Sequence, residues 1–448
     1  MGYKVYAGFL VSTGEGKVGR FKWDDFTLLY DTSESDLSET LECGLYEPDV
    51  ELSNSEIGTF TFRVPQKSFS ADGRTVTNRF YNKFKLRRTF VSIIEDDKEE
   101  IFLGPVTDIT LNFDLSQTIT CASFEDLLQS DTHTIPGRNP VYLTVDTDGE
   151  TDAGTGFEGD YTLYDSVFER AMGALMLPDI GGEYVPIRNW KVDYLLNKSE
   201  DFSSNGDVID TGWNILQSYL FDKYSGYFKL YRIPDKAGDW GGPSELAVFY
   251  SNHGIATTEQ TIEYGKNLLE LTHTYSIPSN FCNHFVVRST KTTTKGWWIF
   301  KKTTVEEITG RAYDDVSREK YGTVFRETQT DSANSEEELN KLAEQTLKEE
   351  YEQEPDEELT IQAFDRYDTG QARDRLGYLK KTHIISPKHG VDGWYVCTKV
   401  SFSLDRPDEK TFQYGNPPKK LTSQQNATTT KANTTQNQTR GIISHINA

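Results

Sequence analysis

Residues 43–129 alternate apolar and polar side chains in a series of short runs, and this pattern constrains the fold more than any other feature of the chain. The runs lie at 58–65, 89–94, 101–113 and 118–124. A charged stretch, 95–100, separates the second run from the third. A period of two places apolar side chains on one face of a strand, and polar turns between such runs favour antiparallel pairing. The sequence therefore predicts antiparallel strands here, followed by a short helix at 125–128.

Length and composition extend this prediction to the whole chain. The chain has 448 residues, of which 12% are aromatic. At roughly 100–200 residues per domain, this length predicts about three domains, each large enough for its own core. Aromatic and β-branched side chains favour strands over helices. We therefore predict an α+β protein that is dominated by β structure.

The chain is strongly acidic, with a formal net charge of -23. A surface with this excess of carboxylates repels nucleic acid phosphates and anionic lipids. The charge therefore argues against a reader of nucleic acid sequence. It is compatible with a channel surface along which DNA can move without being bound.

The cysteines and the apolar runs indicate a chain that folds in a reducing cytoplasm. Cys43, Cys121, Cys282 and Cys397 lie far apart, and no C-x-x-C pair occurs. This spacing favours free thiols over a metal ribbon or a disulfide framework. The amino terminus lacks the features of a secretion signal, and the longest apolar runs are far shorter than a membrane span. We expect a soluble chain with no membrane span.

The middle of the chain carries the first helical pattern. Apolar residues recur at spacings of three, four and seven over 161–177, and Pro178 ends the pattern, which predicts an amphipathic helix. We expect a second helix at 211–221 and a strand at 227–232. Turn-forming Pro-Gly and Asn-Pro pairs in 132–140 mark a boundary before this segment.

A second β-rich segment follows. Its strands are predicted at 267–271, 282–288, 359–365, 394–397 and 400–404. One helix at about 335–353 interrupts them, because Ser335 and Glu338 form a capping box and Pro355 ends the apolar stripe. The last residues, 421–448, are rich in Asn, Thr and Gln and cannot bury enough apolar surface to fold alone. We expect them to form a flexible tail or an intersubunit arm.

The chemical motifs of the chain are weak. Residues 14–19 match G-x-G-x-x-G, but the aromatic, strand-like residues after them favour a hairpin turn over a dinucleotide site, which needs a following helix. The carboxylates of 146–152 could hold Ca²⁺, but their glycine falls one step early for an EF-hand, so a solvated turn is favoured. The scattered histidines lack paired-ligand spacing. We predict no cofactor, no metal site and no catalytic residue, and so no enzyme.

A basic aromatic island at 295–302 stands out in this acidic chain. Trp297, Trp298 and Phe300 lie between lysines. One interpretation is an exposed hairpin tip whose aromatic side chains anchor an interface. The other is a buried strand, with the aromatic side chains in the core. Adjacent tryptophans on a strand point to opposite faces, so at least one of them needs a covering partner.

The order of strands, turns and short helix in 43–129 resembles the first domain of the baseplate hub or tail-tip proteins of long-tailed bacteriophages (the tail-associated, Tal-like N-terminal family). The sequence Gly-Tyr-Phe-Lys-Leu at 226–230, which follows a predicted helix, resembles the insert domain of that family. The sequence Gln-Tyr-Gly at 413–415, followed soon by Leu-Thr, resembles the close of hub domains.

This resemblance implies two tail-tube-like β-barrel domains with an α+β domain inserted between them. The first barrel would cover 1–130, the insert 131–265, the second barrel with its one helix 266–420, and the tail 421–448. The resemblance further implies a homotrimer that adapts a three-fold tip to a six-fold tail tube. Many relatives carry a long C-terminal extension with a hydrolase or receptor-binding module, and this sequence departs from them by stopping at Ala448.

The implied location is the distal tail tip of a virion, after synthesis in the cytoplasm of the host bacterium. The implied partners are a distal tail or tail-tube ring protein, the tape measure protein, and receptor-binding or fibre proteins, while DNA transits without specific binding. Two alternatives remain open: a receptor- or carbohydrate-binding tail protein, and a cell-wall hydrolase that uses an Asp/Glu pair.

Overall fold

The computed structural model is dominated by β structure. It describes residues 2–12, 20–32, 44–54, 56–69, 73–129, 132–135, 141–142, 171, 176–178, 184–186, 190–194, 201–202, 208–217, 227–251, 255–278, 280–295, 302–330, 335–351, 354–367 and 370–415. The chain forms two compact units. The first contains the described residues of Met1–Thr272 and Thr360–Tyr414, and the second contains those of His273–Leu359.

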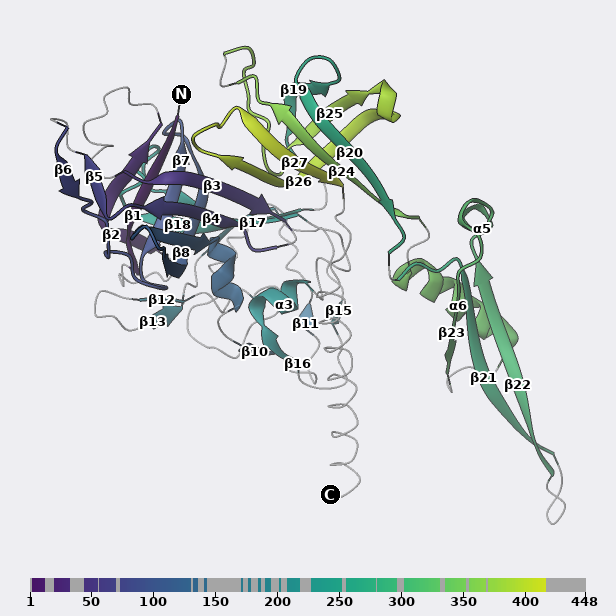
Figure 1. Cartoon of the computed structure of the whole chain (residues 1–448). Coiled ribbons are helices and arrows are strands. Elements are labelled where there is room, and N and C mark those ends of the chain that lie inside the picture. Colours follow the sequence, from purple (N-terminus) through teal and green to yellow (C-terminus); the bar gives the residue numbers. More distant parts are fainter. Residues whose placement is uncertain are drawn as a thin grey trace, which may run out of the picture. The chain divides into compact units, whose positions relative to one another are not determined.

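The first unit begins with a run of antiparallel strands that we call the first β segment (Figure 1). Its strands are β1 (Tyr3–Ser12), β2 (Arg20–Asp31), β3 (Tyr46–Ser53), β4 (Thr59–Val64), β7 (Phe90–Glu95), β8 (Glu99–Leu111) and β9 (Gln117–Ala122). They hydrogen-bond in the order β2-β1-β7-β8-β9-β4-β3. The short helix η1 (Phe124–Gln129) follows, and β5 (Lys67–Phe69) pairs with β6 (Thr75–Thr77). The antiparallel strands predicted for 43–129 are confirmed.

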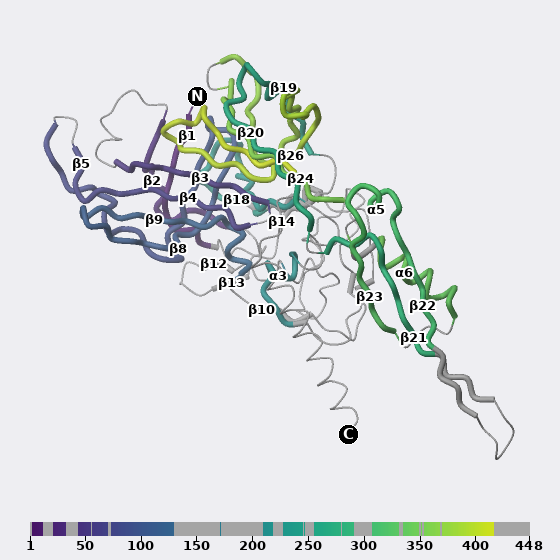
Figure 2. The backbone as a smooth tube through the Cα atoms, turned by 45° about the vertical axis from the view of Figure 1, so that its right-hand side comes forward, coloured from purple at the N-terminus to yellow at the C-terminus, as the bar shows by residue number. Residues whose placement is uncertain are grey.

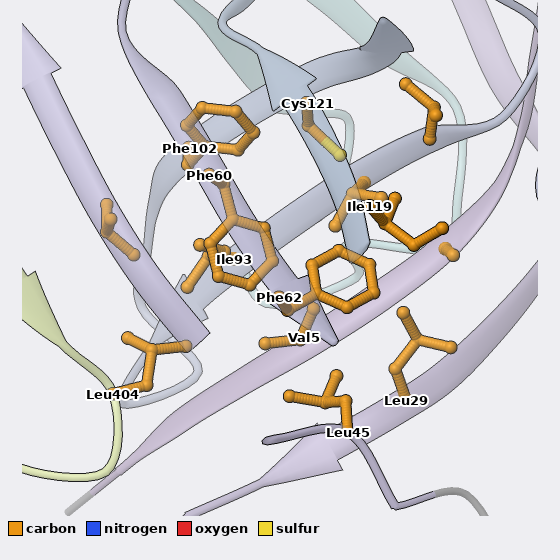
Figure 3. Packing of buried hydrophobic residues seen from close by; sticks show 14 of the residues in the cluster. Val5, Leu29, Leu45, Phe60, Phe62, Ile93, Phe102, Ile119, Cys121 and Leu404 are labelled. Carbon is orange, nitrogen blue, oxygen red and sulfur yellow. The ribbon is translucent and has the colours of Figure 1, made fainter. Parts of the chain in front are cut away.

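The core of the first β segment follows from the alternation in its sequence. In β4, Phe60, Phe62 and Val64 are buried, while the residues between them are half-buried. Side chains from other strands of the segment pack in the same cluster, as Figure 3 shows for Ile93 of β7 and Ile119 of β9. Burial of apolar surface of this kind is the main stabilising contribution to such a core.

Most of the second β segment lies in the same unit. Its strands are β19 (Thr257–Glu263), β20 (Leu268–Ser276), β24 (Asp356–Phe364), β25 (Lys381–Ser386), β26 (Val391–Ser403) and β27 (Glu409–Gly415), with the turn η3 (Pro387–His389) between β25 and β26. The end of β20 after Thr272, the start of β24 before Thr360 and Gly415 belong to the second unit. β26 pairs with β3 of the first β segment, from Lys399↔Ser53 to Ser403↔Asp49. The two segments are therefore parts of one continuous sheet.

Between the two segments, the chain adds strands and a short helix. β17 (Tyr227–Pro234) pairs with β18 (Ser244–Ser251), and β18 also pairs with β2 and, in parallel, with β14 (Trp190–Tyr194). Small pairs are β10 (Thr132–Ile135) with β16 (Val208–Thr211), β11 (Val141–Tyr142) with β15 (Asp201–Phe202), and β12 (Met176–Pro178) with β13 (Tyr184–Pro186). The helix α3 (Gly212–Leu216) begins after Thr211, whose hydroxyl accepts the N–H of Asn214.

The helix predicted at 161–177 is wrong at its C-terminal end. Met176 and Leu177 lie in β12 and pair with Pro186 and Val185. The residue before a proline is disfavoured in the helical region, so Pro178 already biases Leu177 towards an extended conformation. Most of the predicted helix, 161–170 and 172–175, lies outside the described residues.

The second unit is a small sheet with a helix on one face. β21 (His284–Lys295) and β22 (Lys302–Tyr313) run side by side in Figures 1 and 2, and β23 (Phe325–Gln329) pairs in parallel with β21. The helix α5 (Asp315–Tyr321) follows β22, and α6 (Glu336–Glu350) packs its buried residues Leu339, Ala343 and Leu347 against Phe285 and Ala312.

A close contact fixes how α6 approaches the sheet of the second unit. A Cβ atom added at Gly310 of β22 would lie 2.3 Å from the backbone of Leu339. Only glycine leaves room for a helix at this distance, so Gly310 sets the packing of α6 on β22.

The structure also corrects two of the predicted boundaries. The strands predicted at 394–397 and 400–404 are one strand, β26, because a register shift in its pairing with β27 lets the strand continue through Thr398. The helix predicted at 335–353 begins as expected after its cap Ser335, but it ends at Glu350. Tyr351 is extended there and its ring contacts the ring of Phe285, at 5.0 Å between centroids.

Candidate functional site: a polar junction between two β segments

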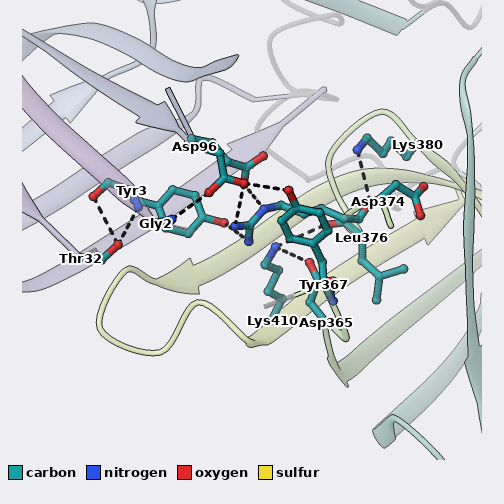
Figure 4. A network of polar contacts seen from close by, with 12 residues as sticks. Gly2, Tyr3, Thr32, Asp96, Asp365, Tyr367, Asp374, Leu376, Lys380 and Lys410 are labelled. Carbon is teal, nitrogen blue, oxygen red and sulfur yellow. Dashed lines mark hydrogen bonds and ion pairs between the residues drawn. The ribbon is translucent and has the colours of Figure 1, made fainter. Parts of the chain in front are cut away.

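Charged side chains from the two β segments meet in the first unit, at a site that we call the polar junction. Its residues are Tyr3, Glu95, Asp96, Asp365, Tyr367, Arg375 and Lys410. Figure 4 shows polar contacts of Tyr3, Asp96, Asp365, Tyr367 and Lys410, which come from both β segments. The polar junction joins the two segments in addition to the main-chain pairing of β3 with β26.

The first side of the junction is set by a tight turn between β7 and β8. Asp96 and Asp97 have φ values of 50° and 57°, in the left-handed region that aspartate tolerates better than most residues. This turn directs the Asp96 carboxylate back towards β1, where it accepts the N–H of Gly2 at 2.8 Å. The same carboxylate accepts the Tyr367 hydroxyl of the second segment at 3.0 Å.

Arg375 is the central cation of the junction. It lies between β24 and β25, and its side chain is 5% exposed. The guanidinium Nε lies 2.9 Å from Glu95 Oε1, and Nη1 donates to the Tyr3 hydroxyl at 2.9 Å. Its planar head lies over the rings of Tyr3 and Tyr367, at 4.9 and 4.5 Å from their centroids. Such stacking of a planar cation between two rings suits arginine and not lysine.

A second buried pair lies beside the first. Lys410 Nζ lies 2.7 Å from Asp365 Oδ2, with side chains 3% and 0% exposed. The Asp365 carboxylate also accepts from the Gln260 amide at 2.6 Å, and Lys410 donates to the carbonyl of Leu376 at 3.3 Å. The ammonium lies 5.1 Å from the centroid of the Phe402 ring. Both charges are thus compensated and hydrogen-bonded, as buried charges require.

The three carboxylates of the junction respond differently to burial. Burial raises the pKa of Glu95, and the charges of Arg375 and Lys410 only partly oppose it. Burial also acts to raise the pKa of Asp365, but Lys410 and the donated hydrogen bonds outweigh it, so the pKa is lowered. The pKa of Asp96 is lowered for the same kind of reason, with burial outweighed by the Gly2 N–H, the Tyr367 hydroxyl and Arg375.

A further buried ion pair ties the middle of the chain to the first β segment. Arg232 of β17 donates to Glu100 of β8 with two nitrogens, at 3.1 and 2.7 Å, and to the carbonyl of Trp240 at 2.7 Å. The guanidinium lies over the rings of Trp23 and Trp240, and its side chain is fully buried. The pair holds β17 next to the start of β8, close to the turn between β7 and β8.

The polar groups most suited to catalysis occupy structural contacts. Ser386 Oγ lies 2.7 Å from His389 Nδ1, but Ser386 is fully buried, so a substrate carbonyl has no path to its hydroxyl in this structure. His383 pairs with Asp392 at 2.9 Å.

In the described part of the chain, no three His, Cys, Asp or Glu side chains come close enough to hold a metal ion together. Within the same residues, every helix is too short or too polar to cross a membrane.

The cysteines that the structure describes are buried and unpaired. Cys121, Cys282 and Cys397 are free thiols, and burial raises the pKa of each. A raised pKa keeps the thiol protonated and unreactive at neutral pH. These residues therefore behave as small apolar side chains. Cys43 lies outside the described residues.

The interface residues predicted from the sequence, Trp297, Trp298 and Phe300, lie outside the described residues, as do the motifs at 14–19 and 146–152. None of the junction residues was predicted as part of a site. The sequence marks 95–100 as a charged turn, but nothing in it shows that this turn meets Arg375, whose position is about 280 residues further along.

No family model matches the chain, and no curated protein matches it. Solved structures similar to it include the prophage tail protein gp18 from Listeria monocytogenes, at 12% identity and a TM-score of 0.43, covering 97% of this chain and 99% of that one. The prophage MuSo2 43 kDa tail protein from Shewanella oneidensis has 12% identity and a TM-score of 0.49, covering 92% and 98%.

A chain of the p2 virion baseplate in its activated conformation is also similar, at 9% identity and a TM-score of 0.43, covering 93% of this chain and 100% of that one. These three similar structures are of phage tail and baseplate proteins. This is the class that the sequence resemblance names.

Proposed function

We propose that the chain is a structural virion protein that forms a homotrimeric hub at the distal end of a phage tail. The observation that carries this proposal is the joining of two sheet-built segments within one compact unit, by the pairing of β3 with β26 and by the polar junction. Three such subunits would present six sheet-built modules in fixed geometry. A three-fold object would then match the six-fold ring of a tail tube.

The domain arrangement is part of the same proposal. The first tail-tube-like barrel covers 1–130, the α+β insert 131–265 and the second barrel 266–420, with 421–448 as a tail or intersubunit arm. The antiparallel strand order of the first β segment supports the first barrel. The buried pair of Arg232 with Glu100 supports an insert that is held firmly against that barrel.

The acidic charge has a mechanical role in this proposal. Each chain has a formal net charge of -23. A trimer of such chains would line its channel with carboxylates that offer DNA no attractive site. DNA would then pass the channel without being slowed by binding. The partners in the tail would be a tube or distal ring protein, the tape measure protein, and receptor-binding or fibre proteins.

The aromatic island at 295–302 would serve as a contact between subunits. β21 and β22 pair as far as Lys295↔Lys302, so the two ends of the island meet at the end of a long hairpin. Trp297→Ala or Trp298→Ala is expected to weaken assembly more than it weakens subunit folding. Sedimentation and thermal unfolding of each variant measure the two effects, and an equal loss in both would contradict an interface role.

The hub proposal is tested by the mass of the purified chain in solution together with negative-stain images. We expect a particle of three times the 51.0 kDa chain mass and a three-fold ring with a central hole. A monomer, or a ring of another symmetry, would overturn the proposal. A binding assay on the lone chain with cells or glycans separates the rival class, because strong binding would favour a receptor- or carbohydrate-binding tail protein.

A further inference from the structure

The turn between β8 and β9 exposes apolar side chains at its tip, residues 111–115. Leu111 is 62% exposed, Phe113 is fully exposed and Leu115 is 50% exposed. Single exposed apolar residues are common on protein surfaces, but three within five residues at one turn are not. The tip therefore calls for an explanation beyond the folding of the chain itself.

The tip is held rigidly by hydrogen bonds. The Asn112 amide donates to the hydroxyls of Ser116 and Thr118, at 3.0 and 2.8 Å, and the Asn112 N–H donates to the Ser116 carbonyl at 2.8 Å. The Asp114 carboxylate accepts the N–H of Ser116 at 3.0 Å and a guanidinium nitrogen of Arg63 at 3.0 Å. A preorganised tip of this kind loses little conformational entropy when it binds.

The conformation of Leu115 gives an independent sign that the fold does not require its side chain. Leu115 has a φ of 65°, in the left-handed region that costs energy for residues with a Cβ and none for glycine. Its side chain is half exposed, so burial within the chain does not offset this cost. Residues held in such conformations tend to cluster at sites of function.

The charges around the tip select the kind of partner. Asp114 and Glu47 both bond Arg63, and Asp108 accepts the hydroxyl of Thr110 nearby. Two carboxylates, those of Asp114 and Glu47, thus share the single guanidinium of Arg63, and the tip carries an excess of negative charge. The whole chain is acidic as well, so charge complementarity at the tip favours a basic partner surface over an acidic one.

We propose that the tip is an anchor that inserts Phe113 into an apolar pocket with a lysine- or arginine-rich rim on a different protein. Leu111 and Leu115 flank the anchor and exclude water around it. An aromatic side chain in a desolvated pocket, surrounded by weaker contacts, is the usual arrangement of an interface hot spot. This inference does not depend on the proposed hub function.

The test places a photoreactive p-benzoylphenylalanine at position 113 of the full-length chain, in the cells that produce it. Position 69 serves as the matched control, because Phe69 is also an exposed phenylalanine, at 57%, on the separate strand β5. We expect light-dependent crosslinking from position 113 to a different polypeptide. The crosslinked peptide, identified by mass spectrometry, should combine apolar residues with flanking lysine or arginine.

The affinity of the partner identified in this way then measures the anchor. Phe113→Ser is expected to weaken binding by about thirtyfold, the size of an interface hot spot, while Phe69→Ser leaves it unchanged. Thermal unfolding of both variants checks that the fold is retained. Crosslinking to a second copy of this chain, or no crosslink above the position 69 control, would overturn the proposal. Binding of the wild-type chain, lost in Phe113→Ser, to vesicles of neutral and anionic lipid would overturn it too.

Discussion

The core of the first β segment and the polar junction are both buried in the first unit, but they are built from opposite kinds of side chain. The core consists of residues such as Phe62 and Ile93, which come from strands close in sequence. The junction consists of paired charges such as Glu95 with Arg375 and Asp365 with Lys410. The core is stabilised by the apolar surface area that it removes from water. The junction depends on the pairing of each charge with a particular partner.

This difference separates stability from specificity. Apolar packing is tolerant, because a core keeps its fold when volume and pattern are roughly preserved. A buried ion pair adds little net stability, since the loss of hydration offsets the attraction, but the loss of one partner leaves an uncompensated charge. We infer that the core makes the first segment fold, whereas the junction determines how the second segment is held against it.

The largest expected effect is at the junction. Lys410→Met leaves the Asp365 carboxylate buried without its cation and should lower the free energy of unfolding by about 3–5 kcal/mol. Adding Asp365→Asn to Lys410→Met removes the stranded charge and should recover part of this loss. Urea denaturation of the wild type and the two variants measures the values. If the double variant is no more stable than Lys410→Met, charge compensation does not explain the pair.

The second prediction concerns acid. The lowered pKa of Asp365 means that its contribution to stability is present above the ordinary aspartate range and is lost as pH falls through the folded pKa. Glu95 has the opposite sign, because its raised pKa gives a contribution that is present below the ordinary glutamate range and is lost as pH rises through the folded pKa. The two carboxylates therefore partly cancel in the pH dependence of stability.

Two variants separate these contributions. Asp365→Asn should flatten the fall in unfolding free energy between about pH 7 and about pH 3, and Glu95→Gln should steepen it. Urea denaturation at a series of pH values gives both slopes. If the unfolding free energy depends on pH with the same slope in both variants, neither carboxylate controls the loss of stability at low pH.

The sequence predicts the core well because its information is local. In 58–65 the alternation alone identifies Phe60, Phe62 and Val64 as buried, and these residues lie in the core. Local information fails where a tertiary contact decides. The apolar period at 161–177 indicates a helix, yet Met176 and Leu177 pair with a strand that the pattern does not show.

The junction could not be predicted from the sequence for the same reason. Arg375 is one of many charged residues in an exposed-looking, turn-rich stretch, and its partners Glu95 and Asp96 lie in a turn that reads as solvated. It is tertiary structure, including the pairing of β3 with β26, that brings the two segments together. A charged residue buried against a distant partner leaves no periodic signal along the chain.

The third prediction compares two cations of equal charge. Arg375→Lys keeps the charge but loses the hydrogen bond to the Tyr3 hydroxyl, the close ion pair with Glu95 and the stacking on two rings. The expected cost is about 1.5–3 kcal/mol, the size of a hydrogen bond to a charged group. The exposed Lys341→Arg on α6 is the matched control, since its pair with Glu337 is at the surface and should change stability little. A neutral Arg375→Lys would mean that only charge matters at the junction.

The smallest expected effect lies in the core and tests its tolerance. Ile93 is fully buried between Val5 and Phe102, and Ile93→Val removes one methylene while it keeps the β-branched shape. The expected loss is about 0.5–1.5 kcal/mol in the free energy of unfolding, from lost burial and a small cavity. Leu86→Ala, at a site that is 55% exposed, is the control and should change the value by less than about 0.5 kcal/mol. A loss at Ile93 as large as that of Lys410→Met would mean that the core is as selective as the junction, and the contrast between the two regions would then fail.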